Sequence, residues 1–402
     1  MNLEIPKKLR PIVEQARLVA ENVFRPISRK YDTAEHAYPK ELDMLAALLD
    51  GMNEGGGRAS ASNLNRHDGE RDPSETTRNG GNLIGVLGMM ELCWGDVGLA
   101  LTIPRQGLGN AAVAAVGTPE QKESFGKAWV AMAITEPSAG SDSAAIRTTA
   151  HLDGDEWVLR GEKIFVTAGE RADAVVVWAT LDASVGRAAI KSFLVPKGAP
   201  GMKVVRLDKK LGIRASDTAT IVFEDCRIPK ENILGSPEID TKKSFAGVMK
   251  TFDNTRPIVA AMAVGVGRAA LDRTKEILGR AHVLGREERP GPNANAIETE
   301  LHRLEAELEV ARLLTMKAAW MADNGIPNSL EASMAKAKAA RVANEITLRC
   351  VEWCGSVGYG EGELLEKWAR DSKILDIFEG TQQIQMLIIA RRLLGKSSAE
   401  LR

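Results

Sequence analysis

The feature that most constrains the fold is the spacing of apolar residues, which changes twice along the chain. In residues 9–49 and 83–125 apolar positions recur every three or four residues, as on one face of a helix. Between 129 and 223 the repeat falls to two, in short runs bounded by Gly, Pro and Asp, which is typical of strands and turns. From 244 to 394 the helical spacing returns. This order predicts an α+β, mostly helical protein whose helices are interrupted by a β-domain.

The same changes of pattern divide the chain into predicted domains. We expect an N-terminal helical domain over residues 1–128, a middle β-domain over 129–240 and a C-terminal helical bundle over 241–402. Within the first domain, residues 51–82 contain Gly, Ser, Asn and alternating charges but almost no apolar side chain. Because such a segment cannot bury a core, we predict a flexible loop there.

Local signals refine the predicted helices. Pro26 and Pro39 should divide the first helical region into at least two helices, because proline disrupts a helix interior. Thr118 precedes a proline and should cap a helix start. The segment 256–278 is rich in Ala and Val, so it should be buried on most faces. Its Gly265-Val266-Gly267 indicates close helix packing, since no strand precedes it as a dinucleotide-binding loop would require.

Composition excludes several classes of function. The 402 residues are 44% hydrophobic with a net charge of −1 and interleaved charges, so no nucleic-acid surface is predicted. No apolar run approaches the roughly 18 residues of a membrane helix, and the N-terminus shows no signal pattern, so we expect a cytoplasmic enzyme with no membrane span. The cysteines and histidines form no grouping typical of a metal site or a catalytic triad: Cys93, Cys226, Cys350, Cys354, His36, His67, His151, His282 and His302.

Glu379 is the first candidate for chemistry. It follows the apolar Ile377 and Phe378 and directly precedes a glycine that should break a helix. A carboxylate in such surroundings is expected to be half-buried, and desolvation raises its pKa toward the range that suits a proton acceptor at neutral pH. A solvated helix end has the same local pattern.

Two stretches of the β-domain combine small residues, hydroxyls and a ring. Residues 131–142 form a strand and a Gly/Pro turn, where backbone amides could approach an anion or a flat ring. An ordinary polar turn has the same composition. In residues 161–169, strand alternation predicts that Phe165 and Thr167 share one face, either against a planar ligand or as a core aromatic beside a surface threonine.

A further stretch, residues 251–257, leads into the predicted buried helix. Asp253 and Arg256 stand three positions apart, which allows a salt bridge across one helical turn. The same two side chains could instead contact a polar ligand, and the spacing fits both interpretations.

These stretches resemble the acyl-CoA dehydrogenase family. The run from Arg370 to Gln385 is similar to the family's C-terminal signature, and the run from Ala131 to Asp142 is similar to its other signature. The resemblance covers nearly the whole chain. It implies a C-terminal four-helix bundle, FAD bound without a dinucleotide-binding fold, and α,β-dehydrogenation of an acyl-CoA thioester. It also implies an oligomer that passes electrons to an electron-transferring flavoprotein.

The resemblance implies a role for each residue at a matching position. Glu379 would remove the proton α to the thioester, and it is the only candidate base because Thr255 occupies the position where some members carry theirs. Phe165 stands where the family typically has Trp. The implied FAD site consists of Met132, Ile134, Thr135, Ser141, Phe165, Val166, Thr167, Thr381 and Gln383. The implied substrate contacts are Ser141, Asp253, Arg256 and Gly380.

Two departures fall where the family serves a neighbouring subunit's FAD. Residues 279–297 lack the Phe of an Arg-x-x-Phe-Gly stretch, and residues 352–356 read Glu-Trp-Cys-Gly-Ser in place of Gln-x-x-Gly-Gly. A carboxylate beside a pyrophosphate is unfavourable unless it is neutralised. A hetero-oligomer in which a related subunit supplies these contacts, with fewer FAD than chains, fits the departures. So does a homo-oligomer in which Arg280, Arg286 or Arg289 replaces them.

Other functions remain compatible with the same residues. An acyl-CoA oxidase on this fold would reoxidise its flavin with dioxygen and release hydrogen peroxide. A weakly catalytic scaffold subunit would complete a partner's site, although the presence of Glu379 and Thr167 argues against it.

Overall fold

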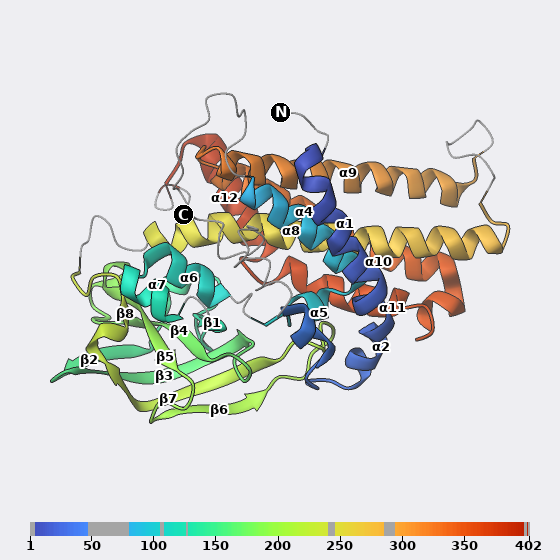
Figure 1. Cartoon of the computed structure of the whole chain (residues 1–402). Coiled ribbons are helices and arrows are strands. Elements are labelled where there is room, and N and C mark those ends of the chain that lie inside the picture. The colour runs from blue at the N-terminus through green and yellow to red at the C-terminus, as the bar shows by residue number, and fades with distance from the viewer. Residues whose placement is uncertain are drawn as a thin grey trace.

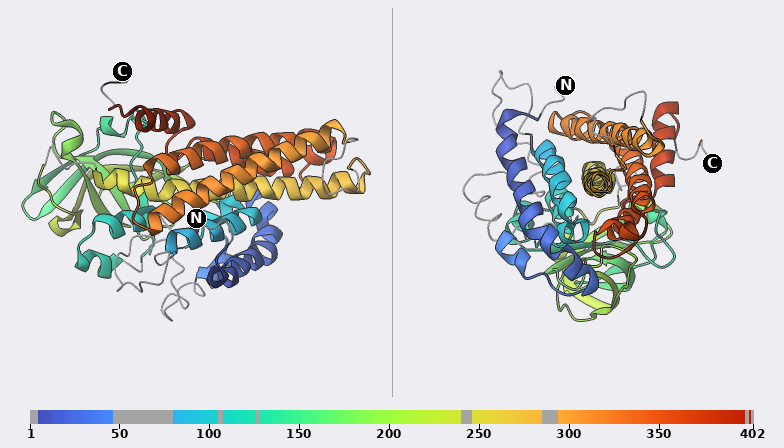
Figure 2. Two further views of the ribbon diagram at one scale, coloured as in Figure 1. Left: turned by 90° about the horizontal axis from the view of Figure 1, so that it is seen from above. Right: turned by 90° about the vertical axis from the view of Figure 1, so that its right-hand side faces the viewer.

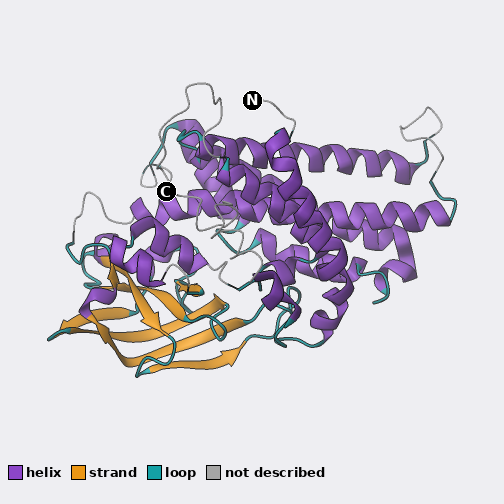
Figure 3. Cartoon of the chain, in the orientation of Figure 1, coloured by secondary structure: helices purple, strands orange, loops and turns teal. Residues whose placement is uncertain are grey.

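The computed structural model has a helical body with a β-domain at one end (Figure 1; Figure 3). Helices precede the β-domain in the chain and follow it, which confirms the predicted α+β, mostly helical class. Of residues 246–254 the structure describes only the backbone, so the side chain of Asp253 is not placed. The predicted loop, apart from 80–82, and Arg286 and Arg289 lie outside the described residues. The structure describes residues 5–46, 80–104, 108–125, 128–239, 246–284, 294–397 and 400.

The first helical region does not break at Pro26. Helix α1 (Arg10–Val19) continues through a π-helical turn at Ala20–Phe24 into α2 (Arg25–Thr33), and the proline occupies the first turn of α2. The expected break at Pro26 is therefore wrong, because the wider turn accommodates the ring and the missing N–H. The division at Pro39 is confirmed, since α2 ends at Thr33 and residues 41–46 form a separate helical segment. This turn packs on Gly95, where a Cβ would lie 2.8 Å from the Cβ of Phe24.

Helices and caps complete the first domain. Asp96 ends one helix in an extended conformation and caps the next, its carboxylate accepting from the N–H of Leu99 at 2.8 Å. The helical spacing that begins at residue 83 is therefore divided between two helices at this point. The predicted cap at Thr118 is confirmed: its hydroxyl accepts from the N–H of Gln121 at 3.3 Å. The helices are α4 (Gly81–Gly95), α5 (Val97–Ala100), α6 (Leu108–Val116) and α7 (Pro119–Phe125), after a short 3-10 turn at Lys7–Leu9.

The β-domain is an eight-stranded sheet with the order β6-β7-β3-β2-β4-β5-β8, and β1 pairs in parallel with β4. Buried side chains cover both faces of β4, whose every residue is buried. The runs expected separately at 157–159 and 163–167 belong to one strand, which bends at Gly161 and again between Lys163 and Val166. The strands are β1 (Val130–Ala133), β2 (Thr149–Asp153), β3 (Glu156–Thr167), β4 (Ala174–Thr180), β5 (Ile190–Pro196), β6 (Met202–Leu207), β7 (Thr218–Pro229) and β8 (Ile233–Leu234).

The last domain is built around one long helix. Helix α8 runs through the middle of the helical body and contacts α4, α9 and α10; Figure 2 shows it end-on in the right-hand view. A Cβ at Gly265 would lie 2.5 Å from the carbonyl oxygen of Met90, so α4 and α8 approach each other closely, as the glycines indicate. The helices are α8 (Ala246–Arg280), α9 (Ala296–Asp323), α10 (Ser329–Tyr359), α11 (Leu365–Ser372) and α12 (Gln382–Leu394), with a 3-10 turn at Lys373–Asp376.

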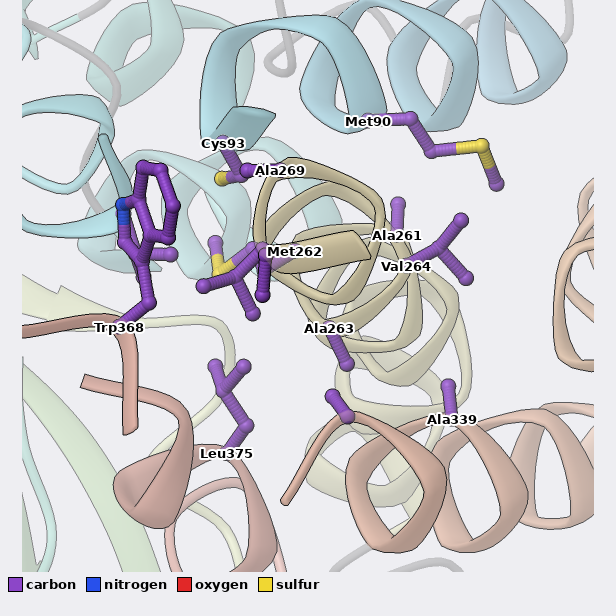
Figure 4. Close-up of a cluster of buried hydrophobic side chains, with 14 of the residues drawn as sticks. Met90, Cys93, Ala261, Met262, Ala263, Val264, Ala269, Ala339, Trp368 and Leu375 are labelled. Atoms are coloured by element: carbon purple, nitrogen blue, oxygen red, sulfur yellow. The ribbon is translucent and has the colours of Figure 1, made fainter. Parts of the chain in front are cut away.

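The main hydrophobic core joins the two helical domains. Figure 4 shows Met90 and Cys93 of α4 against Val264 of α8, with Trp368 and Leu375 on the other side. All five side chains are buried. Because the stretch that leads to Glu379 packs into this core, its position is set by tertiary contacts on both sides of α8.

Candidate functional site

A buried ion pair joins the two β-domain stretches singled out in the sequence. The ammonium group of Lys163, which is fully buried, lies 2.8 Å from a carboxylate oxygen of Glu136. The same ammonium donates to the carbonyl of Ile134 at 3.1 Å, and the N–H of Ile164 donates to the carbonyl of Thr135 at 2.9 Å. The end of β1 and the bend of β3 are therefore held side by side.

The pair is stabilised by further hydrogen bonds. The carboxylate of Glu136 also accepts from the N–H of Arg147 at 2.6 Å and from the hydroxyl of Thr148 at 2.6 Å. Burial acts to raise the pKa of Glu136, but the bonds from Lys163 and Thr148 outweigh it and lower that pKa. Burial lowers the pKa of Lys163 to about 8 despite its partner. Sequence reasoning missed this pair, although a lysine and a glutamate inside apolar strand segments were its signal.

The bend of β3 presents Phe165 outward. The register of β3 against β7 shifts between Lys163 and Val166, so the regular alternation is interrupted at this point. That Phe165 and Thr167 share one face stays a prediction. Phe165 adopts a φ of 58°, a conformation rare for a residue with a side chain, and its side chain is 61% exposed. Thr167 is half-buried beyond the bend. The side chain of Val166 is buried in the core of the sheet, so only its backbone is available to a ligand.

The side chains of the two β-domain stretches would suit a flat aromatic cofactor. Met132 and Ile134 are half-buried and pack on the buried apolar cluster that contains Trp178. Thr135 is half-buried and Ser141 is exposed in the turn after β1. An exposed ring, apolar side chains and hydroxyls are the groups that would pack on a flavin and hydrogen-bond its edge.

Glu379 lies in a tight loop between the 3-10 turn and α12. Both it and Gly380 have positive φ, 54° and 88°. The hydroxyl of Thr255 on α8 donates to its carboxylate at 2.8 Å. Glu379 is half-buried, and burial raises its pKa although the Thr255 bond and the charges of Arg256 and Lys336 act in the opposite direction.

A loop of the β-domain connects the two halves of the candidate site. The carbonyl of Asp217 accepts from the N–H of Ala168, at the end of β3, at 3.1 Å. In the same loop the N–H of Ile213 donates to the carboxylate of Asp371 at 2.5 Å. Asp371 lies on α11, eight positions before Glu379, so the loop ties the strand of Phe165 to the segment that carries the candidate base.

The remaining predicted residues have different surroundings. Arg256 is buried, with 4% of its surface exposed, and its charge acts on Glu379. The hydroxyl of Thr381 accepts from the N–H of Ile384 at 3.3 Å and so caps α12, while Gln383 is exposed on the first turn of that helix. No hydrogen bond from Thr381 or Gln383 to the two β-domain stretches is among those described. Their roles toward a cofactor therefore stay predictions.

The stretch 352–356 also departs from regular helix. Gly355 interrupts α10 with φ 54° and ψ −131°. The carboxylate of Glu352 lies 2.6 Å from the guanidinium of Arg349, so a neutralising charge is already beside it. Arg280 is exposed on the last turn of α8, at 71% of its side chain. Both arginines are open to solvent or to another subunit.

The described part of the chain offers neither a metal site nor a membrane span. No group of three or more His, Cys, Asp or Glu residues there is arranged to hold a metal ion. None of the described helices is long and apolar enough to span a membrane. The cysteines are all buried and unpaired in disulfides.

Removal of the Thr255 hydroxyl should raise the pKa of Glu379. A hydrogen bond donated to a carboxylate favours its charged form. In Thr255→Val this bond is lost, so the protonated form of Glu379 becomes more favourable. We expect the acid limb of any reaction that needs ionised Glu379 to move up by about one pH unit, with little change at high pH. Thr255→Ser keeps the hydroxyl and should leave the limb in place. The pH dependence of flavin reduction measures the shift, and superimposable profiles for Val and Ser would contradict it.

Comparison with known proteins agrees with this fold. Residues 131–226 match the family model of the acyl-CoA dehydrogenase middle domain, and residues 245–394 match that of the acyl-CoA dehydrogenase C-terminal domain. The short-chain specific acyl-CoA dehydrogenase from mitochondria of Bos taurus is 35% identical over 406 residues, which cover 98% of this chain and 92% of the relative. The chain therefore belongs to the acyl-CoA dehydrogenase family.

Solved structures show the same architecture. Butyryl-CoA dehydrogenase from Megasphaera elsdenii has a TM-score of 0.84 and 30% identity, covering 98% of this chain and 100% of that one. A chain described with the electron transferring flavoprotein of Acidaminococcus fermentans has a TM-score of 0.81 and 32% identity, with coverage of 98% and 100%. The chain is an oxidoreductase of this class, an acyl-CoA dehydrogenase with FAD as its cofactor.

Proposed function

We propose that the chain removes the α and β hydrogens of an acyl-CoA thioester and passes the electrons to an electron-transferring flavoprotein. The observation that carries the proposal is the environment of Glu379, whose half-buried carboxylate is held by Thr255 and has a raised pKa. A base of this kind suits abstraction of a weakly acidic proton. Family membership supports the thioester as the substrate class.

In the proposed reaction Glu379 takes the proton from the carbon α to the thioester carbonyl. Bound FAD supplies the acceptor for the β hydrogen, which leaves with its electron pair as a hydride. The loss of one proton and one hydride converts the acyl chain to the α,β-unsaturated product. Backbone donors near Glu379 would stabilise the negative charge that develops on the thioester oxygen.

The proposed site residues divide into cofactor and substrate contacts. Phe165 would pack on the flavin and Thr167 would hydrogen-bond its edge, with Val166 contributing through its backbone. Ser141 and Gly380 lie in loops at the two halves of the site and are proposed substrate contacts. The other proposed FAD contacts are Met132, Ile134, Thr135, Thr381 and Gln383, and the other proposed substrate contacts are Asp253 and Arg256.

Anaerobic mixing with a panel of acyl-CoA esters tests the proposal. The oxidised flavin band should bleach within the first turnover for at least one ester, and the panel begins with butyryl-CoA because the relatives are named for short chains. An oxidase would instead release hydrogen peroxide in air. Electron transfer to an added electron-transferring flavoprotein, without peroxide, supports the dehydrogenase. No bleaching with any ester by the FAD-loaded protein would contradict the proposed reaction.

The number of FAD molecules per chain tests the assembly. The homo-oligomer and the hetero-oligomer differ in whether this chain alone completes its cofactor sites. Because Arg349 neutralises Glu352 and Arg280 is exposed, we propose the homo-oligomer and expect about one FAD per protomer for the chain expressed alone. Absorbance of released FAD against protein concentration measures it. About half occupancy, restored to full by a related partner subunit, would favour the hetero-oligomer.

The proposed domain limits remain 1–128, 129–240 and 241–402. The structure ends α7 at Phe125 and begins β1 at Val130, which supports the first limit. Helix α8 begins at Ala246 after the last strand, which supports the second. Separate expression of the segment 129–240 would test whether the β-domain folds alone.

A further inference from the structure

Lys336 on α10 is a fully buried lysine that the reaction described above does not use. Its ammonium group donates to the carbonyl of Gly380 at 2.6 Å. Among the described residues, the other two fully buried lysines are Lys163 and Lys367, and each lies within 2.8 Å of a carboxylate. Lys336 instead bonds to the carbonyl of Gly380, the residue directly after the proposed base. Burying an ammonium group is costly unless its surroundings compensate, so its placement calls for a physical reason.

The first reason is conformational. Glu379 and Gly380 both have positive φ, which is strained for a residue with a side chain. A strained loop of this kind persists only where its surroundings hold it. The side-chain amide of Gln385 donates to the carbonyls of both residues, at 3.2 and 3.1 Å. Lys336 adds the bond from the neighbouring helix, so the loop is held from α12 and from α10.

The second reason is electrostatic. The charged groups that act on Lys336 are Asp376 of the 3-10 turn, Glu379 of the loop and Arg256 of α8. Burial lowers the pKa of Lys336 to about 8, so it carries its charge at neutral pH. A positive charge near Glu379 favours the ionised carboxylate, while burial disfavours it. On the α8 side, Thr255 and Arg256 act on Glu379 in the same direction as Lys336.

We infer that Lys336 is a positioning residue for Glu379, which fixes the Gly380–Thr381 peptide of the Glu379 loop and supplies a buried positive charge that favours the ionised base. The inference rests on the proposed function, because it assigns Lys336 a part in the same proton abstraction. The two effects are separable in principle, since an uncharged donor can keep the hydrogen bond without the charge.

Two substitutions separate the bond from the charge. Lys336→Met removes both, and we expect the acid limb of anaerobic flavin bleaching to move up by about one pH unit or more. The maximum rate of flavin bleaching should also fall about tenfold, because the loop of Glu379 and Gly380 loses its hydrogen bond from α10. Lys336→Gln keeps a donor, so it should shift the limb in the same direction and lose less of the highest rate. Lys338→Met, two positions along α10 where the lysine pairs with Glu307, is the matched control and should change neither.

A measurement without turnover makes the outcomes distinguishable. The infrared band of a protonated carboxyl that disappears in Glu379→Gln reports the ionisation of Glu379 directly. In Lys336→Met this band should persist to higher pH than in the wild type. If both variants bind FAD and keep the wild-type titration, the inference is wrong although bleaching of the wild type upholds the proposed function. If no ester bleaches the wild type, the proposed function fails, and the infrared titration still decides the effect of Lys336. Should Lys336→Met not fold, the titration of Lys336→Gln decides the inference.

Discussion

Glu379→Gln should keep its FAD and lose the bleaching of that FAD by acyl-CoA. The amide is the same size as the carboxylate and can still accept from the hydroxyl of Thr255, which lies 2.8 Å away, so the loop should keep its shape. It cannot take a proton at neutral pH. Removal of a positioned general base typically costs a factor of about 10² to 10⁴, so we expect the rate of flavin reduction to fall at least about a hundredfold.

Stopped-flow absorbance at the oxidised flavin band measures this loss. Glu309→Gln is a matched control, because Glu309 lies on α9 and pairs with Arg312 on the surface of that helix. It should bleach at the wild-type rate. A scaffold subunit would be indifferent to both substitutions. Undiminished bleaching in Glu379→Gln at full FAD content would show that another group removes the proton.

The second large effect is expected at Lys163, whose removal should weaken FAD binding. In Lys163→Met the carboxylate of Glu136 stays buried without its counter-charge, which typically costs about 3–5 kcal/mol. The bond to the carbonyl of Ile134 is lost as well, so the end of β1 and the bend of β3 are no longer tied together. We expect a lower melting temperature of the apoprotein and at least a tenfold rise in the dissociation constant of FAD.

Two further variants identify the cause. Glu136→Gln combined with Lys163→Met removes the uncompensated charge, so it should recover much of the stability that the single variant loses. Lys203→Met lies in the same sheet, where the lysine pairs with Glu224 and both side chains are more than 60% exposed, and it should cost at most about 1 kcal/mol. Thermal unfolding and FAD titration measure both quantities. Equal effects of Lys163→Met and Lys203→Met would rule out a special role for the buried pair.

The sequence was sufficient to predict the elements whose signals are local. The change of apolar spacing located the helices and the strands, and the hydroxyl of Thr118 located a helix start. Close packing at Gly265 followed from a residue without a side chain in an apolar helix. Each of these features depends on residues that are close together in the sequence, so a short segment is enough to predict it.

Local patterns missed the features that distant or irregular contacts decide. The π-helical turn before Pro26 packs on Gly95 of another helix, and no local pattern reports that contact. The register shift in β3 lies between Lys163 and Val166, and in the same stretch Lys163 is paired with Glu136 from another part of the β-domain. The boundary inside 83–101 depends on Asp96, which is also bound by Lys367 from the far end of the chain.

By itself the sequence determined the class of fold and the two stretches with the family's signatures, and through that resemblance it predicted Glu379 as the base. Only the tertiary structure decided what surrounds that base: Thr255 from α8, Lys336 from α10 and Gln385 from α12. The physical reason is that secondary structure follows from neighbouring residues, whereas the pKa and direction of a buried carboxylate depend on groups that are distant in the chain and are brought together only by folding.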